Sequence, residues 1–280
     1  MKTWLITGSS RGFGRQWATA ALDRGDRVAA TARDTGALDD LVRQYGDAVL
    51  PLALDVTDRE AAVAAVHRAH EHFGRIDVLV NNAGYGQFGM VEELSEAELR
   101  RQLETNFFGA VWTTQAVLPL MRTQGGGHVV QVTSEGGVFA YPGIGAYHAS
   151  KWALEGLSQS LAQEVARFGI RVTLVEPGGY ATDFGGSSAA QAQPLPDYAA
   201  AHEEISRAAA EQWSPERLGD PAATRAAILA VVDADEPPLR VFFGDGPLAR
   251  ITTDYEQRLA TWRAWEPVSV AAQGTPLGAH

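Results

Sequence analysis

Short apolar runs alternate with longer amphipathic segments along the first 175 residues of this 280-residue chain. The apolar runs are predicted to be strands, and segments such as Glu60–Phe73 and Leu99–Met121 are predicted to be helices. Strands separated by helices indicate repeated βαβ units, a parallel sheet and helices on both of its faces. The predicted strands are Trp4–Thr7, Arg27–Ala32, Val49–Leu54, Ile76–Val80, His128–Thr133 and Arg171–Val175.

The alternation becomes irregular after Pro177. Residues 178–197 are rich in Gly, Ser, Ala, Gln and Pro, which is typical of a long loop. The elements predicted beyond this loop are two helices, Ala199–Gln212 and Ala222–Asp233, and a last strand, Leu239–Phe243. The predicted fold class is therefore α/β, with one doubly wound, Rossmann-type domain over residues 1–266 and a seven-stranded, mostly parallel sheet. A flexible C-terminal tail is predicted for residues 267–280.

Composition and charge narrow the classes of function. The net charge of −11 argues against a nucleic-acid partner, because phosphate binding needs concentrated Lys and Arg. No apolar stretch approaches the roughly 20 residues that are needed to span a membrane. The chain has no cysteine, and so no disulfide, thiolate metal site or cysteine nucleophile. The first residues do not resemble a secretory signal, so we expect a soluble cytoplasmic protein that binds no nucleic acid, membrane or metal.

A glycine-rich turn, Thr7-Gly8-Ser9-Ser10-Arg11-Gly12-Phe13-Gly14, joins the first predicted strand to a helical segment. Its three glycines permit a tight turn, close approach of the backbone to a pyrophosphate, and close packing of helix on strand. The helix N-terminus offers free N–H groups and the positive end of its dipole to phosphates. A glycine trio alone is equally typical of an ordinary turn. Its place between a strand and a helix predicts a dinucleotide site.

The end of the second predicted strand indicates which dinucleotide is bound. An acidic residue there selects the free 2′-hydroxyl of the adenine ribose, but this strand ends in Ala32 and is followed by Arg33. A guanidinium can bind a 2′-phosphate through paired hydrogen bonds, and Arg11 in the glycine loop could approach the same phosphate. Asp34 is the one residue here that favours the unphosphorylated ribose. The sequence therefore favours NADP(H) over NAD(H).

A tyrosine and a lysine one helical turn apart open the segment that runs to about Arg167. Tyr147 and Lys151 share one helix face, so that both side chains can address the same small volume. A nearby ammonium lowers the pKa of a phenol from its usual value near 10, which a tyrosine acting as a base requires. Ser134 follows the strand His128–Thr133 and therefore lies at the sheet edge where ligands bind. Each feature alone also fits an ordinary surface pair or a capping serine.

Taken together, these motifs resemble those of the short-chain dehydrogenase/reductase family. The resemblance covers residues 1 to about 182, in the family's order and approximate spacing. The matching segments are Thr7-Gly8-(x)3-Gly12-x-Gly14, Asn81-Asn82-Ala83-Gly84, Asn106, Ser134, Tyr147-(x)3-Lys151 and Pro177-Gly178.

The resemblance implies hydride transfer between a nicotinamide and a carbonyl or alcohol. Tyr147 would then move the proton, and Ser134 would orient the reacting oxygen. Lys151 would bind the nicotinamide ribose and lower the pKa of Tyr147, while Asn106 would hold a water that links Lys151 to solvent. These four residues are the predicted catalytic set.

The resemblance also implies where the rest of the cofactor binds. Asp55 and Val56 would contact the adenine, Asn82 to Gly84 the adenosine ribose, and the segment from Pro177 to Thr182 the carboxamide. From the residues alone, Asn82 is equally typical of a turn and Asp55 of a helix cap. The predicted cofactor-binding set is Gly8, Ser10, Arg11, Gly12, Phe13, Gly14, Arg33, Asp55, Val56, Asn82, Ala83, Gly84, Tyr147, Lys151, Pro177, Gly178, Tyr180 and Thr182.

Three loops, residues 85–93, 135–146 and 178–196, are expected to surround the substrate. They contain no Lys or Arg and several aromatic side chains, which favours an apolar or aromatic substrate over a phosphorylated or carboxylated one. The predicted substrate contacts are Phe88, Phe139, Tyr141 and Phe184, although each of these side chains could instead pack beneath its loop. Residues 178–215 resemble the substrate lid of the family.

Two other functions are compatible with the same fold. One is an epimerase, dehydratase or dehalogenase, although the intact glycine loop argues against an enzyme without a cofactor. The other is a non-catalytic NADP(H)-sensing regulator, although all four catalytic positions are filled. A homodimer or homotetramer is expected from the resemblance, through Leu99–Met121 and Tyr147–Arg167, unless the small residues of these helices pack on the sheet.

Overall fold

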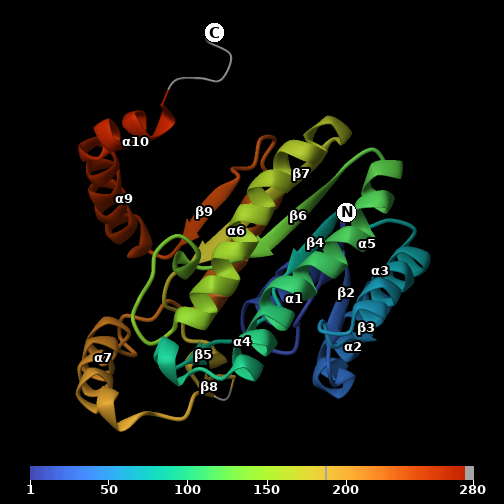
Figure 1. The fold of residues 1–280 in the computed structure, drawn as a ribbon. Coiled ribbons are helices and arrows are strands. Elements are labelled where there is room, and N and C mark those ends of the chain that lie inside the picture. Colours follow the sequence, from blue (N-terminus) through green and yellow to red (C-terminus); the bar gives the residue numbers. More distant parts are fainter. Residues whose placement is uncertain (187, 275–280) are drawn as a thin grey trace.

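A parallel sheet forms the centre of the protein in the computed structural model, which describes residues 1–186 and 188–274. Its strands are β1 (Thr3–Ile6), β2 (Arg27–Ala32), β3 (Val49–Ala53), β4 (Val78–Asn81), β6 (Gly127–Val132), β7 (Ile170–Pro177) and β9 (Arg240–Phe243). The seven strands lie in the order β3-β2-β1-β4-β6-β7-β9, and every neighbouring pair is parallel (Figure 1). The predicted doubly wound α/β fold is confirmed, with all seven strands parallel rather than most of them.

Helices cover both faces of the sheet. The helices on one face are α1 (Gly12–Asp23), α2 (Asp39–Tyr45) and α8 (Thr224–Asp233). Those on the opposite face are α3 (Arg59–Phe73), α5 (Gly109–Thr123) and α6 (Gly145–Val165). Three of them, α3, α6 and α8, match the predicted helices Glu60–Phe73, Tyr147–Arg167 and Ala222–Asp233 to within two residues at each end, because each presents one apolar stripe to the strands. No helix was predicted over α2.

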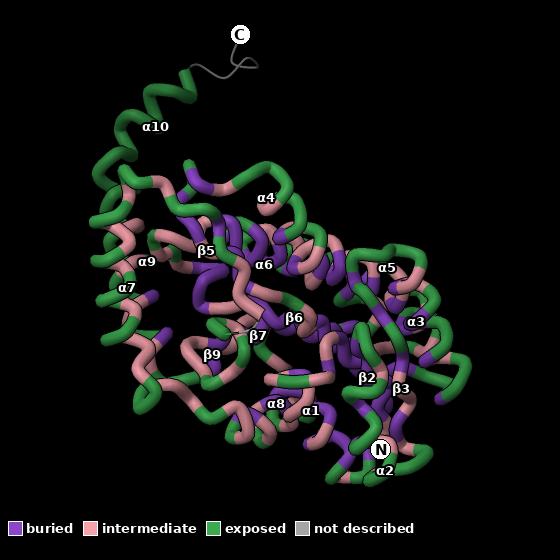
Figure 2. The backbone as a smooth tube through the Cα atoms, turned by 90° about the horizontal axis from the view of Figure 1, so that it is seen from below, coloured by how far each residue is buried: buried purple, intermediate pink, exposed green. Residues whose placement is uncertain are grey.

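Successive side chains of β1 point to opposite faces of the sheet, and the core is accordingly divided into two layers. Trp4 and Ile6 pack with α1 and α8, whereas Leu5 between them packs with α3 and α5. All three side chains are fully buried, and burial of each is worth roughly 1.5–3 kcal/mol. Figure 2 shows the buried backbone concentrated in the strands and in the helix faces that cover them.

The predicted continuous helix Leu99–Met121 is interrupted in the structure. It consists of α4 (Glu96–Leu103), a π-helical turn over Glu104–Phe108, and α5. Periodicity does not reveal such a turn, because one extra residue per turn shifts the apolar pattern only slightly. The π-helical turn contains Asn106, whose side chain is buried.

The strand order reverses direction between β1 and β4, and the loops that follow these two strands therefore diverge. Ligands of open parallel sheets bind at this position, outside the carboxyl ends of the strands. Asn82, which follows β4, donates from Nδ2 to the carbonyl oxygens of Thr7 and Gly8, at 2.9 and 3.0 Å. The two loops are thus tied together at the place where a dinucleotide would cross the sheet.

A second, two-stranded parallel sheet was not predicted. It pairs β5 (Gln87–Phe88) with β8 (Ala190–Gln191) and so attaches the lid, residues 178–215, to the loop after β4. The predicted helix Ala199–Gln212 is present as α7 and lies within the lid. Strands of two residues carry too little apolar pattern to be predicted from sequence.

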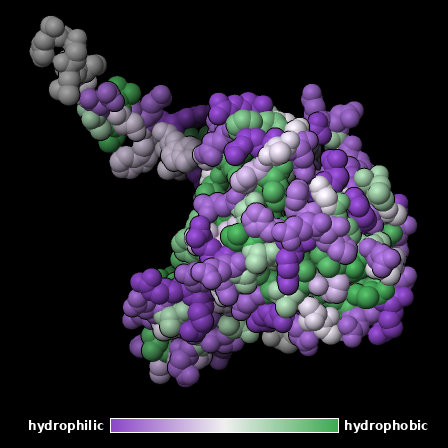
Figure 3. Space-filling model, turned by 90° about the vertical axis from the view of Figure 1, so that its right-hand side faces the viewer, coloured by the Kyte–Doolittle hydropathy of each residue, from purple (hydrophilic) through white to green (hydrophobic). Residues whose placement is uncertain are grey.

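The C-terminal segment forms an arm of two helices, α9 (Pro247–Ala264) and α10 (Glu266–Gln273). Figure 3 shows the outer part of this arm projecting from the rest of the molecule. The tail predicted as flexible from residue 267 thus begins in a helix, whereas its residues 275–280 lie outside the described residues. Among the described residues, no helix is long and apolar enough to cross a membrane.

Candidate active site

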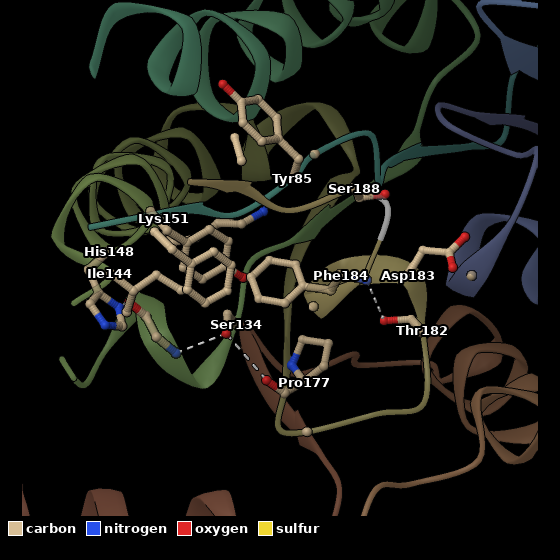
Figure 4. Close-up of a pocket in the computed structure, with 18 of the residues that line it drawn as sticks. Tyr85, Ser134, Ile144, His148, Lys151, Pro177, Thr182, Asp183, Phe184 and Ser188 are labelled. Atoms are coloured by element: carbon tan, nitrogen blue, oxygen red, sulfur yellow. Dashed lines mark hydrogen bonds between the residues drawn. The ribbon is translucent and has the colours of Figure 1, made fainter. Parts of the chain in front are cut away.

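A cavity of about 1570 Å³ opens along the carboxyl ends of the strands, between the glycine loop and the lid (Figure 4). It is bordered by residues from the ends of β2, β4, β6 and β7. Nearly all of the predicted site residues line it. The exceptions are Gly14, Asn106 and Phe139.

The glycine loop forms a cradle that suits a pyrophosphate. Gly8 and Gly12 have positive φ values of 68° and 56°, which side chains rarely adopt. A Cβ atom on Gly14 would overlap the carbonyl oxygen of Gly8, so this glycine permits the close packing of α1 on the loop rather than lining the cavity. No side chain caps the start of α1, and its first turn holds no acidic residue. The free N–H groups of α1 therefore fit an anion.

The two arginines predicted to bind a 2′-phosphate, Arg11 and Arg33, have different surroundings. Arg33 is exposed and lines the cavity beside Ala32. Arg11 instead contacts the lid, with Nη1 3.2 Å from the carboxylate of Asp183 and Nη2 donating to Ser188 Oγ at 2.6 Å. The Asp34 carboxylate accepts the backbone N–H of Gly36 at 2.9 Å and thus caps a short turn. Arg33 is therefore the better placed of the two for a 2′-phosphate.

Asp55 and Val56, the residues predicted to contact an adenine, both line the cavity. The carboxylate of Asp55 accepts the N–H and the hydroxyl of Thr57, at 3.0 and 2.8 Å, and so closes a local turn. The helix cap that Asp55 could have been is instead Asp58, whose side chain caps the start of α3. Asn81 is buried rather than placed in a turn. Its side chain binds Thr113, Thr114 and Gln131 beneath the cavity.

Tyr147 and Ser134 meet at the inner end of the cavity, as their positions in the sequence predict. Ser134 donates to the carbonyl oxygen of Pro177 at 3.5 Å and accepts the N–H of Gly136 at 3.0 Å, which fixes its hydroxyl (Figure 4). Burial raises the pKa of Tyr147 to about 12, hydrogen bonding to Ser134 lowers it, and the charge on Glu135 raises it. The phenol is thus held in its protonated form near neutral pH, as a proton donor requires.

Lys151 lies one turn further along α6, with its ammonium nitrogen 5.7 Å from the centre of the Tyr147 ring. Nζ donates to the carbonyl oxygen of Val132 at 2.8 Å. Burial lowers the pKa of Lys151 to about 8. Hydrogen bonding to Ser134 is the cause that lowers the pKa of Tyr147 here, and the part of Lys151 in lowering it, which the resemblance implies, stays a prediction.

Asn106 lies behind the cavity wall and braces the loop after β4. Its Oδ1 accepts the N–H of Tyr85 at 3.0 Å, and its Nδ2 donates to the carbonyl oxygen of Tyr85 at 2.9 Å and to Ser150 at 3.1 Å. A Cβ atom on Gly84 would lie 3.1 Å from Oδ1 of Asn106 and 3.6 Å from Nζ of Lys151. Because Gly84 has no side chain, Asn106 and Lys151 can lie close to the loop after β4.

The segment after β7 closes the cofactor side of the cavity. Pro177, Gly178 and Thr182 line it, and the hydroxyl of Thr182 accepts the N–H of Phe184 at 3.4 Å. The Tyr180 ring lies edge-on to Phe13, with centroids 5.0 Å apart, so both aromatic residues also support the glycine loop.

Three of the four aromatic residues predicted to contact a substrate line the cavity. Phe184 points from the lid into the cavity (Figure 4), and its ring centroid lies 6.1 Å from that of Phe88. Tyr141 also lines the cavity, with its ring edge-on to Trp213 at 5.2 Å. Phe139 is outside the cavity and packs on Tyr141 at 4.9 Å, which is the alternative allowed for such side chains.

Comparison with known proteins identifies the family. The family model described as short chain dehydrogenase matches residues 2–193. The chain is 42% identical over 275 residues to "Oxidoreductase BOA17" of Botryotinia fuckeliana, covering 97% of this chain and 99% of that protein. It superposes on a short-chain dehydrogenase from Streptomyces avermitilis with a TM-score of 0.87 and 43% identity, over 97% of this chain and 100% of the other. The chain belongs to the short-chain dehydrogenase/reductase family.

Two solved relatives indicate the type of cofactor that this short-chain dehydrogenase/reductase fold holds. An alcohol dehydrogenase from Thermococcus sibiricus is complexed with 5-hydroxy-NADP; it is 28% identical, with a TM-score of 0.72 over 87% of this chain and 96% of that one. A relative from Burkholderia phymatum is complexed with NAD; it is 25% identical, with a TM-score of 0.80 over 93% of this chain and 95% of that one. Both dinucleotides thus occur on this fold.

Sequence reasoning missed several residues of this short-chain dehydrogenase/reductase site. Ile205, Ala209 and Trp213 line the cavity from α7 and its C-terminal end. Their spacing of four residues is the signal that could have identified an apolar face of the lid helix. His148 was also missed: its ring accepts the N–H of Tyr141 and donates to the carbonyl oxygen of Gly136, both at 2.8 Å. It therefore braces the loop that carries Ser134.

The lid is anchored by another residue that sequence reasoning missed. The fully buried carboxylate of Glu93 accepts the N–H groups of Met90 and Leu195, at 2.7 and 2.9 Å, and contacts Nε2 of His202 at 2.7 Å. Leu195 and His202 both belong to the lid, so the Glu93 carboxylate holds the lid to the body at two positions. Among the described residues, no group of three or more His, Asp or Glu side chains is placed to hold a metal ion.

Proposed function

We propose that this oxidoreductase uses NADP(H) to transfer hydride between a nicotinamide and a carbonyl or secondary alcohol of an apolar or aromatic substrate. The observation that carries the proposal is the convergence of Tyr147, Ser134 and Lys151 on one end of a cavity whose other end is the glycine loop. A proton donor, an oxygen-binding hydroxyl and a dinucleotide cradle therefore share one continuous space.

The side chains supply the proton chemistry of this reaction. When bound, the nicotinamide supplies hydride for reduction or accepts it in oxidation. Ser134 would hold the substrate oxygen, and Tyr147 would donate its phenolic proton to that oxygen as the carbonyl becomes an alcohol. Reduction requires the protonated phenol, which burial favours here. Lys151, with its pKa lowered to about 8, can then pass a proton to the phenolate near neutral pH.

The preference for NADP(H) rests on Arg33. Its guanidinium is exposed at the end of β2 and lines the cavity, where a 2′-phosphate would lie. The carboxylate of Asp34, which could favour NAD(H), is turned to the N–H of Gly36.

The apolar substrate class rests on the lining of the inner cavity. Phe88, Phe184 and Ile144 face it from the body and the lid, together with Ile205 and Trp213 from α7 and its C-terminal end. Apolar walls with a few polar groups bind apolar ligands and orient one reactive oxygen.

A screen of ketones and secondary alcohols with NADPH and with NADH tests the reaction. We expect turnover with an aryl or alkyl ketone, a lower KM for NADPH than for NADH, and a loss of about 100-fold or more in Tyr147→Phe. Unchanged NADPH binding by that variant would show that its fold and cofactor site remain intact. Tight NADPH binding without any turnover would instead indicate a sensor, and product formation without net change in NADPH would indicate an epimerase or dehydratase.

We also propose that the chain forms a homodimer or homotetramer through α6. Ala149 and Gly156 do not pack on the sheet: both are exposed, and a Cβ atom on Gly156 would meet nothing within 4 Å. Trp152 on the same helix is 38% exposed. Light scattering after size exclusion should give a dimer or tetramer mass, and Trp152→Glu should reduce it. A monomer in the unaltered protein would contradict the proposal.

A further inference from the structure

A buried acidic side chain stands directly beside the catalytic serine. Glu135 follows Ser134 in the chain and is only 4% exposed. A carboxylate is costly to bury without a partner, and it acts over a longer range inside a protein than in water. The reaction proposed above gives Glu135 no role, although the residue lines the same cavity as Tyr147.

The partner of Glu135 comes from the far end of the chain. Arg250 in the first turn of α9 donates from Nη2 to Oε2 of Glu135 at 2.6 Å. The charge of Arg250 also acts on Tyr141, whose hydroxyl accepts from Gln212 of the lid at 3.4 Å. Arg250 therefore lies between the carboxylate next to Ser134 and Tyr141, one of the aromatic residues that line the cavity.

The beginning of α9 is held firmly enough to place this guanidinium. A Cβ atom on Gly178 would lie 2.9 Å from Cγ of Pro247, so the first residue of α9 packs directly against the segment after β7. Pro247 and Ile251 are the buried residues of the helix and lie on either side of Arg250 in the chain. The first turn of α9 is thus part of the body, and Arg258 further along the helix lies over the ring of Trp152 on α6, 5.3 Å from its centre.

Glu135 acts on several titratable groups around the site. Burial raises the pKa of Tyr147 and of Tyr141, and the negative charge of Glu135 adds to both; burial lowers the pKa of His148, and Glu135 opposes that. Charged groups that pack around the same loop are Lys151 and Glu155 on α6 and Arg250 on α9. Of these, Arg250 is the one that hydrogen-bonds to the Glu135 carboxylate.

We propose that Arg250 is a positioning residue for the catalytic pair: it neutralises Glu135 and holds the Ser134 loop, so that the carboxylate does not oppose formation of the Tyr147 phenolate. The proposal rests on the assigned roles of Tyr147 and Ser134. Through Arg250, helix α9 would then take part in setting the pH range of the reaction. A phenolate next to an unpaired carboxylate would be two like charges in a poorly hydrated space, which shifts titration to higher pH.

Four variants test the proposal by the direction in which each moves the titration of Tyr147. Arg250→Met keeps the aliphatic stem and removes the charge, and it should move the Tyr147 titration to higher pH by about one unit. Glu135→Gln should move it to lower pH, because the cation then stands alone. The double variant Glu135→Gln/Arg250→Met should return close to the original titration, and Arg250→Lys, which retains the charge, should stay near it.

Two measurements report the titration. The first is the pH dependence of kcat/KM for alcohol oxidation, in which the phenolate is the base. The second is the ultraviolet difference absorption of the phenolate, taken for each protein against the same protein carrying Tyr147→Phe. The second measurement needs no turnover, so failure of the proposed reaction and failure of this inference are distinguishable. Arg258→Met is the matched control, since Arg258 lies on α9 but pairs with Asp254 at 2.9 Å, and it should leave the titration unchanged.

If the Arg250–Glu135 pair only stabilises the fold, the four variants should behave differently. Both charge-neutralising variants would then lower turnover or thermal stability without moving the titration, and this would overturn the proposal. A shift in Arg250→Met that persists in the double variant would also overturn it, because the effect would not pass through Glu135. If Arg250→Met does not fold, the shift of Glu135→Gln to lower pH remains a decisive measurement, and its absence would refute the inference.

Discussion

The ring of Phe184 lies edge-on to the ring of Tyr147, with their centroids 4.9 Å apart. Phe184 belongs to the lid and Tyr147 to α6, so the lid directly covers the proposed proton donor. Gly86 makes room for this contact, because a Cβ atom there would lie 2.7 Å from Cζ of Phe184. The burial that raises the pKa of Tyr147 to about 12 therefore depends in part on one lid side chain.

Replacement of Phe184 should consequently change the titration of Tyr147. Phe184→Ala admits water to the phenol, which weakens the largest cause of the raised pKa, so the pKa should fall toward its usual value near 10. Phe184→Leu retains an apolar cover and should change it less. Difference absorption of the phenolate measures both, and equal pKa values in Phe184→Ala and the unaltered protein would show that the lid does not control burial of the phenol.

Arg33 is expected to select the phosphorylated cofactor. Arg33→Ala should raise KM for NADPH about tenfold, the scale of one charge-assisted contact, and leave KM for NADH nearly unchanged. The variant Arg43→Ala provides a control, because Arg43 is an exposed arginine at the end of α2 and is not among the residues that line the cavity. An unchanged KM for NADPH in Arg33→Ala would remove the main support for the cofactor preference.

Glu93 is expected to control the lid. Glu93→Gln replaces one accepting oxygen by an NH2 group, which can only donate. One of the bonds to Met90, Leu195 or His202 must therefore be lost. The lid should open more often, raising KM for the substrate several-fold and speeding proteolysis within residues 178–215. Glu96→Gln is the control, because Glu96 is exposed on α4 and bonds to Arg100 of the same helix rather than to the lid. Equal proteolysis of the two variants would contradict an anchoring role.

Gly14 is expected to be indispensable for the shape of the glycine loop. In Gly14→Ala the added methyl would overlap the carbonyl oxygen of Gly8 and approach Nδ2 of Asn82, which binds the same loop. The variant should lose NADPH affinity and unfold at a lower temperature. Gly185→Ala, where a methyl meets nothing within 4 Å, should unfold at the original temperature. Undiminished NADPH binding by Gly14→Ala would show that the loop can relax.

The strands were predictable from sequence because each is an apolar run whose burial on both faces leaves a local signal. The predicted and observed bounds of the second strand are identical, Arg27–Ala32, and those of the others differ by one or two residues at an end. The π-helical turn at Asn106 left no comparable signal, because its side chain is satisfied by Tyr85 and Ser150, which are distant in the chain.

The convergence of Tyr147, Lys151 and Ser134, the residues proposed for proton transfer, was predictable for a related reason. Tyr147 and Lys151 are fixed relative to each other by one helical turn, and Ser134 by the end of one strand, so local geometry brings them to the same edge of the sheet. The substrate side was predicted less well. Phe88, Tyr141 and Phe184 line the cavity but Phe139 does not, since loop residues without regular periodicity do not indicate which way they point.

The sequence by itself determined the doubly wound sheet, the glycine loop at its first crossover and the residues that perform the proposed proton transfer. These features follow from periodicity and from spacings within single elements, which short-range sterics impose. Only the tertiary structure decided that Arg11 contacts the lid, that Phe184 covers Tyr147, and that Arg250 neutralises Glu135 from 115 residues away. Contacts of this kind depend on how separate elements pack, and their strength depends on the burial that packing creates.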